Sequence, residues 1–224
     1  LRKKPVSSIV SSPIYRKTNV RMKTNSSKNI KAAITAVGGF VPKDFISNQD
    51  LEKVLDTTDE WITTRTGIKK RRILKGEAKG TSYLAIKAAE DLIKKSNINP
   101  ETIDLVIVST ITPDYKGAAT APSVASAINA KNAYAFDLSA ACSGFLYGMS
   151  SATSYIESGR YNKVLLIGAD KMSSVVDYSK RETSILFGDG AGAVLVEPSN
   201  NNFGWEDEYL RSDGIGAEWL MVKG

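Results

Sequence analysis

The sequence contains no histidine among its 224 residues. The side chain that most often acts as a general base and as a metal ligand is therefore missing. Cysteine is nearly absent as well: the only one is Cys142, which excludes an intrachain disulfide and a cysteine–histidine zinc site. No apolar run approaches the about 18 residues of a membrane-spanning helix. These absences exclude a disulfide scaffold and fit a reducing compartment.

Acidic residues are missing from the start of the chain. Nine lysines and arginines lie within residues 1–31, and the first acidic residue is Asp44. Subtracting these nine charges from the net charge of +6 leaves −3 for the rest. The excess positive charge is thus confined to residues 1–31, and the remaining sequence gives no reason to expect a nucleic-acid partner.

The leader itself, residues 1–30, is rich in serine, lysine and arginine and predicts disorder. It resembles a transit peptide in composition, but it also fits a basic tail, or upstream sequence before a true start at Met22. We favour the start at Met22. A first domain is expected over 31–200, followed by a connecting segment over 201–224.

The hydrophobic pattern beyond the leader alternates between the periods of strands and helices. Apolar runs predict strands at 32–37, 105–110, 134–138, 164–169 and 191–196. Helical spacing predicts helices at 48–55, 59–65, 81–96, 122–130 and 144–158. This alternation predicts an α/β fold with a mostly parallel sheet that is layered with helices.

The single cysteine lies where one of these strands ends and a helix begins. Unpaired N–H groups and the helix dipole favour the nucleophilic thiolate form at such a position. Small neighbours from Ser139 to Gly144 leave room for a substrate. Taken alone, Cys142 fits either a nucleophile or an inert buried thiol.

Several motifs together resemble one family. They are D-L-S-A-A-C-S-G-F at 137–145, D-T-T-D-E-W-I-T-T-R-T-G-I at 56–68, F-G-D-G-A-G-A at 187–193 and D-K-M-S-S at 170–174. In order and spacing they are similar to β-ketoacyl-acyl-carrier-protein synthase III, a condensing enzyme of the thiolase-like fold. The resemblance runs from about residue 32 to the end and implies the first half of a two-half fold.

The resemblance implies a chemistry for Cys142. In that family the cysteine takes an acyl group, usually acetyl, from coenzyme A, and its backbone N–H serves as an oxyanion donor. The thioester then condenses with malonyl-acyl carrier protein, which initiates fatty acid biosynthesis. No permanently bound cofactor is expected, and coenzyme A thioester enters as substrate. The resemblance also implies a homodimer in the bacterial cytoplasm, or in a plastid if residues 1–30 are a transit peptide.

The same resemblance assigns the coenzyme A contacts. Trp61 and Arg65 match positions that stack on adenine and bind phosphate, Thr57 matches a hydrogen-bonding position, and Arg181 matches an arginine on the other side of the adenine. Glu182 departs from the family, where a small or neutral residue is usual. The glycines of 187–193 lack the Lys-Ser/Thr of a phosphate-binding loop, and the resemblance implies a turn that brings Phe187 near the cysteine.

A histidine and an asparagine complete the site of the family, and they come from its second half. Because this sequence has no histidine, we interpret it as a fragment that is inactive in condensation alone. Alternatives are a starter-unit enzyme of the polyketide or hydroxymethylglutaryl-coenzyme A synthase kind, and a non-catalytic partner or binding module on the same fold. Retention of Cys142 argues against the last. Residues near 112–121, together with residues from a partner subunit, are expected to set the acyl preference.

Overall fold

The computed structural model describes residues 30–77, 79–199, 201, 203–216, 218, 220 and 221. The expected leader, apart from residue 30, and the expected start at Met22 lie outside the described residues. Residues 219 and 222 lie outside them too.

A five-stranded sheet forms the centre of the domain, in the order β1-β7-β6-β4-β5. Its strands are β1 (Ala32–Phe40), β4 (Leu105–Ser109), β5 (Tyr134–Leu138), β6 (Val164–Lys171) and β7 (Asp189–Pro198). β4 pairs in parallel with both β5 and β6, whereas β7 is antiparallel to β6 and to β1. Four strands therefore share one direction and β7 opposes them, so the sheet is mixed.

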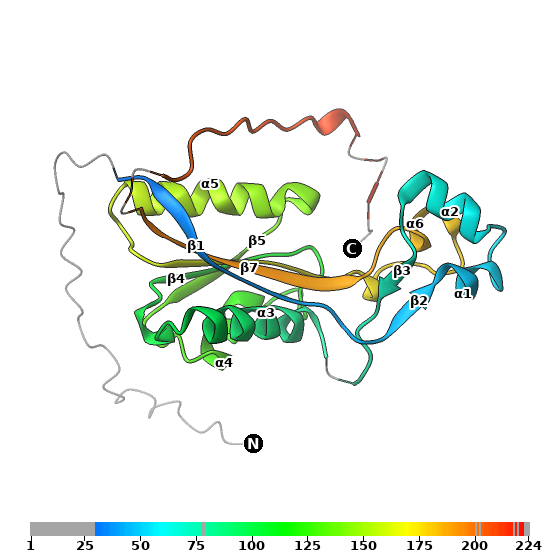
Figure 1. Ribbon diagram of the computed structural model, residues 1–224, viewed down its shortest axis with the longest axis horizontal. Coiled ribbons are helices and arrows are strands. Elements are labelled where there is room, and N and C mark those ends of the chain that lie inside the picture. The colour runs from blue at the N-terminus through cyan, green and yellow to red at the C-terminus, as the bar shows by residue number, and fades with distance from the viewer. Residues whose placement is uncertain are drawn as a thin grey trace, which may run out of the picture.

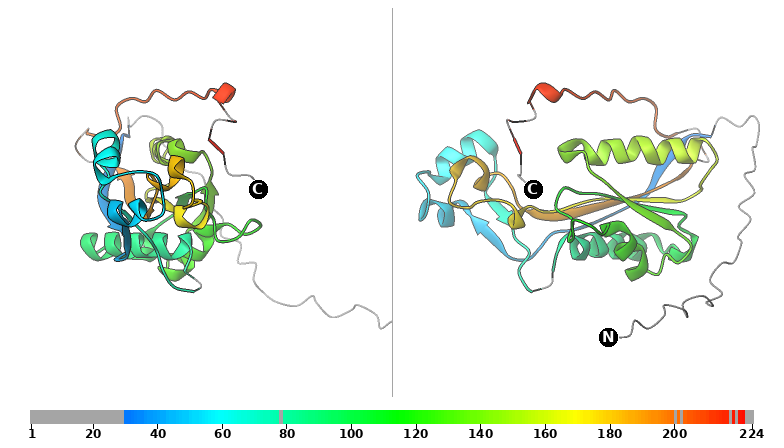
Figure 2. Two further views of the ribbon diagram at one scale, coloured as in Figure 1. Left: turned by 90° about the vertical axis from the view of Figure 1, so that its right-hand side faces the viewer. Right: turned by 180° about the vertical axis from the view of Figure 1, so that it is seen from behind.

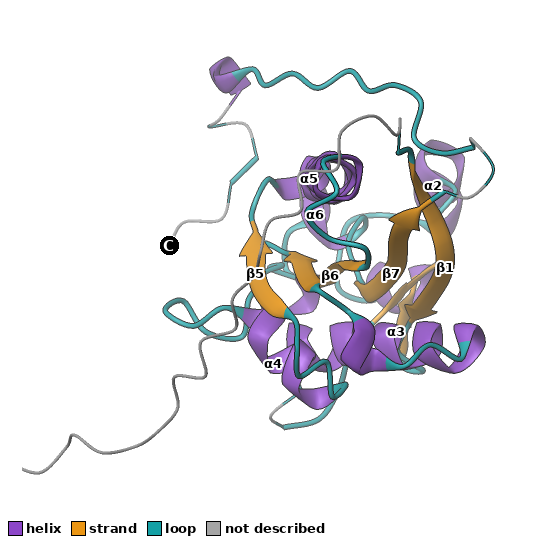
Figure 3. Cartoon of the chain, turned by 90° about the vertical axis from the view of Figure 1, so that its left-hand side faces the viewer, coloured by secondary structure: helices purple, strands orange, loops and turns teal. Residues whose placement is uncertain are grey.

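Helices cover both faces of this sheet (Figure 1). α3 (Thr81–Ser96) and α4 (Thr120–Ala127) lie on one face and α5 (Gly144–Glu157) on the other, as the view along the strands shows (Figure 3). β4 is buried throughout: Val106 and Val108 pack with α3 and α4, while Leu105 and Ile107 pack with α5. Burial on both faces explains why this strand is a continuous apolar run.

A small lobe lies beyond one end of the sheet (Figure 2). It consists of β2 (Phe45–Ser47), α1 (Asn48–Glu52), α2 (Asp59–Thr66), β3 (Lys70–Arg72) and α6 (Arg181–Ser184). β2 and β3 pair antiparallel, and Leu51, Ile62 and Ile185 form a core of their own. The lobe therefore joins a segment early in the chain to the connection between β6 and β7.

Local signals set the helix boundaries in this lobe. Ser47 begins α1 with a capping box to Asp50, and the Thr58 hydroxyl accepts the N–H of Trp61 at the start of α2. Gly67 ends α2 with a φ of 71°, a conformation that suits glycine. Single-turn 3₁₀ helices occur at Pro100–Thr102, Ala141–Ser143, Met172–Ser174 and Gly214–Gly216.

The segment after β7 runs in extended form along the outer side of α5 (Figures 1 and 2). Tyr147 donates a hydrogen bond to the Arg211 carbonyl at 2.9 Å, and Ser150 donates one to the Glu208 carboxylate at 2.7 Å. Trp205 packs against the core beneath α5. In the part of the chain that is described, no helix is both long and apolar enough to cross a membrane.

The predicted elements agree with these bounds in large part. α3 and β5 match residue for residue, and the expected strands and helices all occur within a few residues of their predicted ends. The β2–β3 pair was not predicted. The α/β class with helices on both faces is confirmed, and the antiparallel placement of β7 is the feature that the simple strand–helix alternation missed.

Candidate active site

Cys142 is exposed and lies in the 3₁₀ turn between β5 and α5. The residue before it, Ala141, has a φ of 47°, in the left-handed region that side chains other than glycine rarely adopt. This backbone conformation costs an alanine about 1 kcal/mol or more. Strained residues of this kind concentrate at functional sites, so the strained turn supports a functional role for Cys142.

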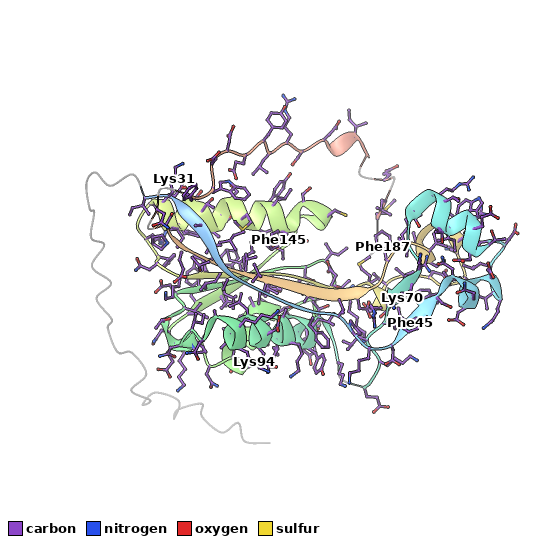
Figure 4. The ribbon with its side chains drawn as sticks, in the orientation of Figure 1. Lys31, Phe45, Lys70, Lys94, Phe145 and Phe187 are labelled. Atoms are coloured by element: carbon purple, nitrogen blue, oxygen red, sulfur yellow. The ribbon has the colours of Figure 1, made fainter. Side chains whose placement is uncertain are left out.

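A cavity of about 290 Å³ opens beside the cysteine. Its lining combines Cys142 and Ala141 with residues from the carboxyl ends of β4 and β6, the region where β7 begins and the first turn of α5: Ser109, Phe145, Gly168, Ala169, Asp170, Gly188, Gly190, Ala191 and Gly192. Phe145 is labelled between α5 and the sheet in Figure 4. Ligand sites of α/β proteins occur at the carboxyl ends of the strands, and this cavity has that position.

The first turns of α5 lie close against the sheet, which fixes the start of the helix. The Ser109 hydroxyl donates to the Gly144 carbonyl at 3.0 Å. A Cβ atom on Gly148 would lie 2.5 Å from Cδ1 of the buried Leu166, so any larger residue here would force the Leu166 side chain to shift. The position of Cys142 relative to β4 and β6 is therefore set by packing, not by the turn alone.

Asp170, which lines the cavity, holds the loop that follows β4. Its Oδ1 accepts hydrogen bonds from the Ile111 and Thr112 N–H groups and from the hydroxyls of Thr110 and Thr112, at 2.9 to 3.2 Å. A carboxylate that accepts several donors orders them strongly. Asp170 thus fixes the beginning of the loop expected to set the acyl preference.

Asp137, in the cysteine motif, has a structural partner. Its two oxygens accept the N–H groups of Thr120 and Ala121 at 2.7 Å each. A carboxylate at a helix N-terminus satisfies free donors and complements the helix dipole. Asp137 therefore ties β5, and with it the cysteine turn, to α4.

The lobe brings together the residues that the sequence assigned to coenzyme A. The Arg65 guanidinium lies 4.4 Å from the centroid of the Trp61 ring, and that of Arg181 lies 4.9 Å from it. Arg181 also donates to the Asp56 carbonyl at 2.9 Å, next to Thr57. Thr57 has a buried hydroxyl that finds no hydrogen-bond partner in the described chain. Three of the four predicted residues, Trp61, Arg65 and Arg181, thus meet, although Trp61 also packs against the core of the lobe.

Two further expectations concern single residues. Glu182 is exposed and forms no ion pair with Arg181 among the described residues. The turn at 187–193 does reach the cysteine cavity, but through Gly188, Gly190, Ala191 and Gly192; Phe187 is not among the lining residues. Phe187 lies where the lobe meets β7 (Figure 4).

No cluster of three or more potential metal ligands occurs in the described ranges.

Comparison with known proteins agrees with this geometry. The profile of the family 3-oxoacyl-[acyl-carrier-protein] synthase III matches residues 136–214. A β-ketoacyl-[acyl-carrier-protein] synthase III from Bacteroides thetaiotaomicron is 51% identical over 196 residues, which is 88% of this chain and 58% of the relative.

Solved structures give the same result. The synthase III from Thermus thermophilus superposes with a TM-score of 0.80 at 42% identity, over 84% of this chain and 58% of that one. The priming β-ketosynthase of the R1128 polyketide pathway has a TM-score of 0.74 at 36% identity, over 79% of this chain and 52% of that one. The chain spans 58% of the length of its Bacteroides relative. In sequence and in fold, it is therefore related to the β-ketoacyl-acyl-carrier-protein synthases III, as its motifs predict.

Proposed function

We propose that this chain carries the acyl-accepting site of a β-ketoacyl-acyl-carrier-protein synthase III. The Cys142 sulfur attacks the thioester carbonyl of an acyl-coenzyme A, and the family resemblance implies acetyl as the acyl group. The bond from that carbonyl to the coenzyme A sulfur breaks, the acyl group stays on Cys142, and coenzyme A leaves as its thiol with the proton lost by the cysteine.

One observation carries the proposal. Cys142 is exposed at a cavity, directly after the strained Ala141, where the carboxyl ends of the central strands meet the start of α5. An inert structural thiol would be buried. The small side chains around the cavity leave space for a thioester to reach the sulfur.

Trp61, Arg65, Arg181 and Thr57 take the nucleotide end of coenzyme A in this proposal. An indole face suits stacking on adenine, and guanidinium groups suit phosphate oxygens. In the free chain both guanidinium groups lie against the Trp61 ring. Adenine must therefore displace at least one of them, or share the ring with it, when it binds.

Condensation with malonyl-acyl carrier protein is proposed for the complete enzyme. The resemblance assigns that step to a histidine and an asparagine, and this sequence contains no histidine. The residues described here support the acyl transfer to Cys142, which needs neither of those groups.

The assignment of the nucleotide site is tested with two acyl donors. We expect Trp61→Ala and Arg65→Ala to slow acyl transfer to Cys142 from acetyl-coenzyme A by about tenfold, the effect of losing a stacking or charged contact. Transfer from the acetyl thioester of N-acetylcysteamine, which has no nucleotide, should be unchanged. Equal slowing with both donors, or no slowing with either, would show that the two residues only pack.

A priming enzyme of polyketide synthesis is the second candidate, favoured by the 36% identity to the R1128 enzyme. It differs in the starter acyl group and not in the cysteine chemistry. Competition between acetyl- and longer acyl-coenzyme A donors for Cys142 separates the two: preference for acetyl supports fatty acid initiation, and preference for a longer chain supports a polyketide starter role.

The complete enzyme is further proposed to be a cytoplasmic homodimer. The resemblance suggests this assembly, and β5 ends the sheet with one edge that no described strand pairs with. An open strand edge is a ready site for pairing with a second chain. Light scattering of the complete enzyme tests the dimer directly.

A further inference from the structure

Arg71 is a buried arginine whose partners are all neutral. It lies in β3 with 2% of its surface exposed. Its Nε donates to the Ile185 carbonyl at 2.7 Å, and Nη1 donates to the Asn48 side-chain carbonyl. No carboxylate forms an ion pair with it among the described residues, and Nη2 is buried without a partner there. Burying a charge without a counter-charge costs free energy. The burial of Arg71 in the lobe therefore needs a structural or functional explanation.

Its neighbour on the strand behaves differently. Lys70 is exposed, with its ammonium group 5.0 Å from the centroid of the Phe45 ring. Burial lowers the pKa of Arg71, although a guanidinium remains protonated. Because successive side chains of a strand point to opposite faces, Arg71 is buried in the lobe whereas Lys70 lies at the surface.

The first contact of Arg71 leads to α2. Asn48 accepts from Arg71 and, through its side-chain N–H₂ group, donates toward the Asp59 carboxylate, the Thr63 hydroxyl and the Ile68 carbonyl. Asp59 and Thr63 lie on α2, on either side of Trp61 in sequence. The position of Arg71 is thereby linked to the helix that carries Trp61 and Arg65.

The second contact leads to α6. Ile185, whose carbonyl accepts from Arg71, directly follows α6, which begins with Arg181. One side chain therefore connects the element that carries Trp61 to the element that carries Arg181, and these two residues are 120 positions apart in sequence. Figure 1 shows β3 beside α2 and α6 in the lobe.

We propose that Arg71 is a positioning residue, which sets the separation of Trp61 and Arg181 for the nucleotide end of the coenzyme A thioester. This role rests on the proposed function. Arginine suits it because the guanidinium donates in several fixed directions at once, whereas a lysine ammonium cannot reproduce that geometry.

The test measures coenzyme A binding by calorimetry in the wild-type chain and in Arg71→Lys and Arg71→Met. Lys70→Met, which removes a neighbouring positive charge from the surface of the same strand, is the matched control. We expect both Arg71 variants to weaken binding about tenfold, the effect of losing hydrogen bonds of a charged group, and Lys70→Met to bind like wild type. The rate at which iodoacetamide alkylates Cys142, which lies in the turn before α5 and outside the lobe, should be the same in all four.

A double-mutant cycle separates positioning from general stability. If Arg71 acts through Arg181, Arg71→Lys should cost little further affinity in an Arg181→Ala background. Equal losses in both backgrounds overturn the positioning role, and so does an Arg71→Lys variant that binds like Lys70→Met. Global unfolding of both Arg71 variants, seen by circular dichroism, also overturns it, since the residue then serves stability. A wild-type chain that binds no coenzyme A contradicts the proposed function first and removes the basis for this role.

Discussion

Replacement of Asp170 by asparagine should destabilise the domain more than its single hydrogen-bonding atom would suggest. Oδ1 accepts four donors from the loop after β4, at 2.9 to 3.2 Å. Hydrogen bonds to a charged group are worth about 1 kcal/mol more than neutral ones. Because four bonds that share one oxygen are not additive, we expect a loss of about 2–3 kcal/mol in the free energy of unfolding.

Urea unfolding followed by circular dichroism measures this loss. With a slope of about 2 kcal/mol per molar urea for a domain of this size, the midpoint should fall by about 1–1.5 M. Asp177→Asn is the control: that carboxylate is exposed, accepts from Ser179 in its own turn and pairs with the exposed Lys180 at 3.6 Å, so water can replace these partners and its midpoint should move far less. Equal midpoints for the two variants would refute the reasoning that Asp170 organises the loop.

Two further predictions concern the backbone before the cysteine and the start of α1. Ala141→Gly should leave the urea midpoint unchanged or raise it, because glycine relieves the positive φ at the cost of a more flexible unfolded chain, whereas Ala141→Val should lower it; the reverse order would show that the turn is not strained. The Ser47 hydroxyl and N–H lower the pKa of Asp50 from 3.8 to about 2. A lowered pKa stabilises the folded form above pH 3.8, and this contribution is lost as the pH falls toward 2; a carboxyl titration by NMR should show the pKa of Asp50 rising toward 3.8 in Ser47→Ala, and an unchanged pKa would contradict the capping box.

Much of the sheet could be predicted because its central strands, β4 and the first half of β6, are buried on both faces. β4 and β6 are apolar at nearly every position, and α3 has a clean amphipathic pattern that ends at Asn97 in the left-handed conformation. Such signals are local. β2 and β3 could not be found in this way, since each has three residues and its partner lies more than 20 positions away.

In the candidate site, too, some features follow from local sequence and others depend on segments that are distant in the chain. The position of Cys142 between a strand and a helix follows from local pattern, and the structure adds the strain at Ala141. The meeting of Trp61 with Arg181 depends on distant segments, and only the family resemblance indicated it. Arg71 was not singled out, because a run of basic residues usually predicts a solvated surface. Asp170 was noted only as part of the motif at 170–174, because the partners of a carboxylate cannot be read from sequence.

The central claim is that Cys142 accepts an acyl group from coenzyme A. The most direct measurement is the intact mass of the chain after incubation with acetyl-coenzyme A, followed by peptide mapping. We predict one added acetyl group per chain, located on Cys142, sensitive to hydroxylamine as a thioester is, and absent from a folded Cys142→Ser variant. A folded wild-type chain that gains no acetyl group, or one that gains it equally in Cys142→Ser, would contradict the account.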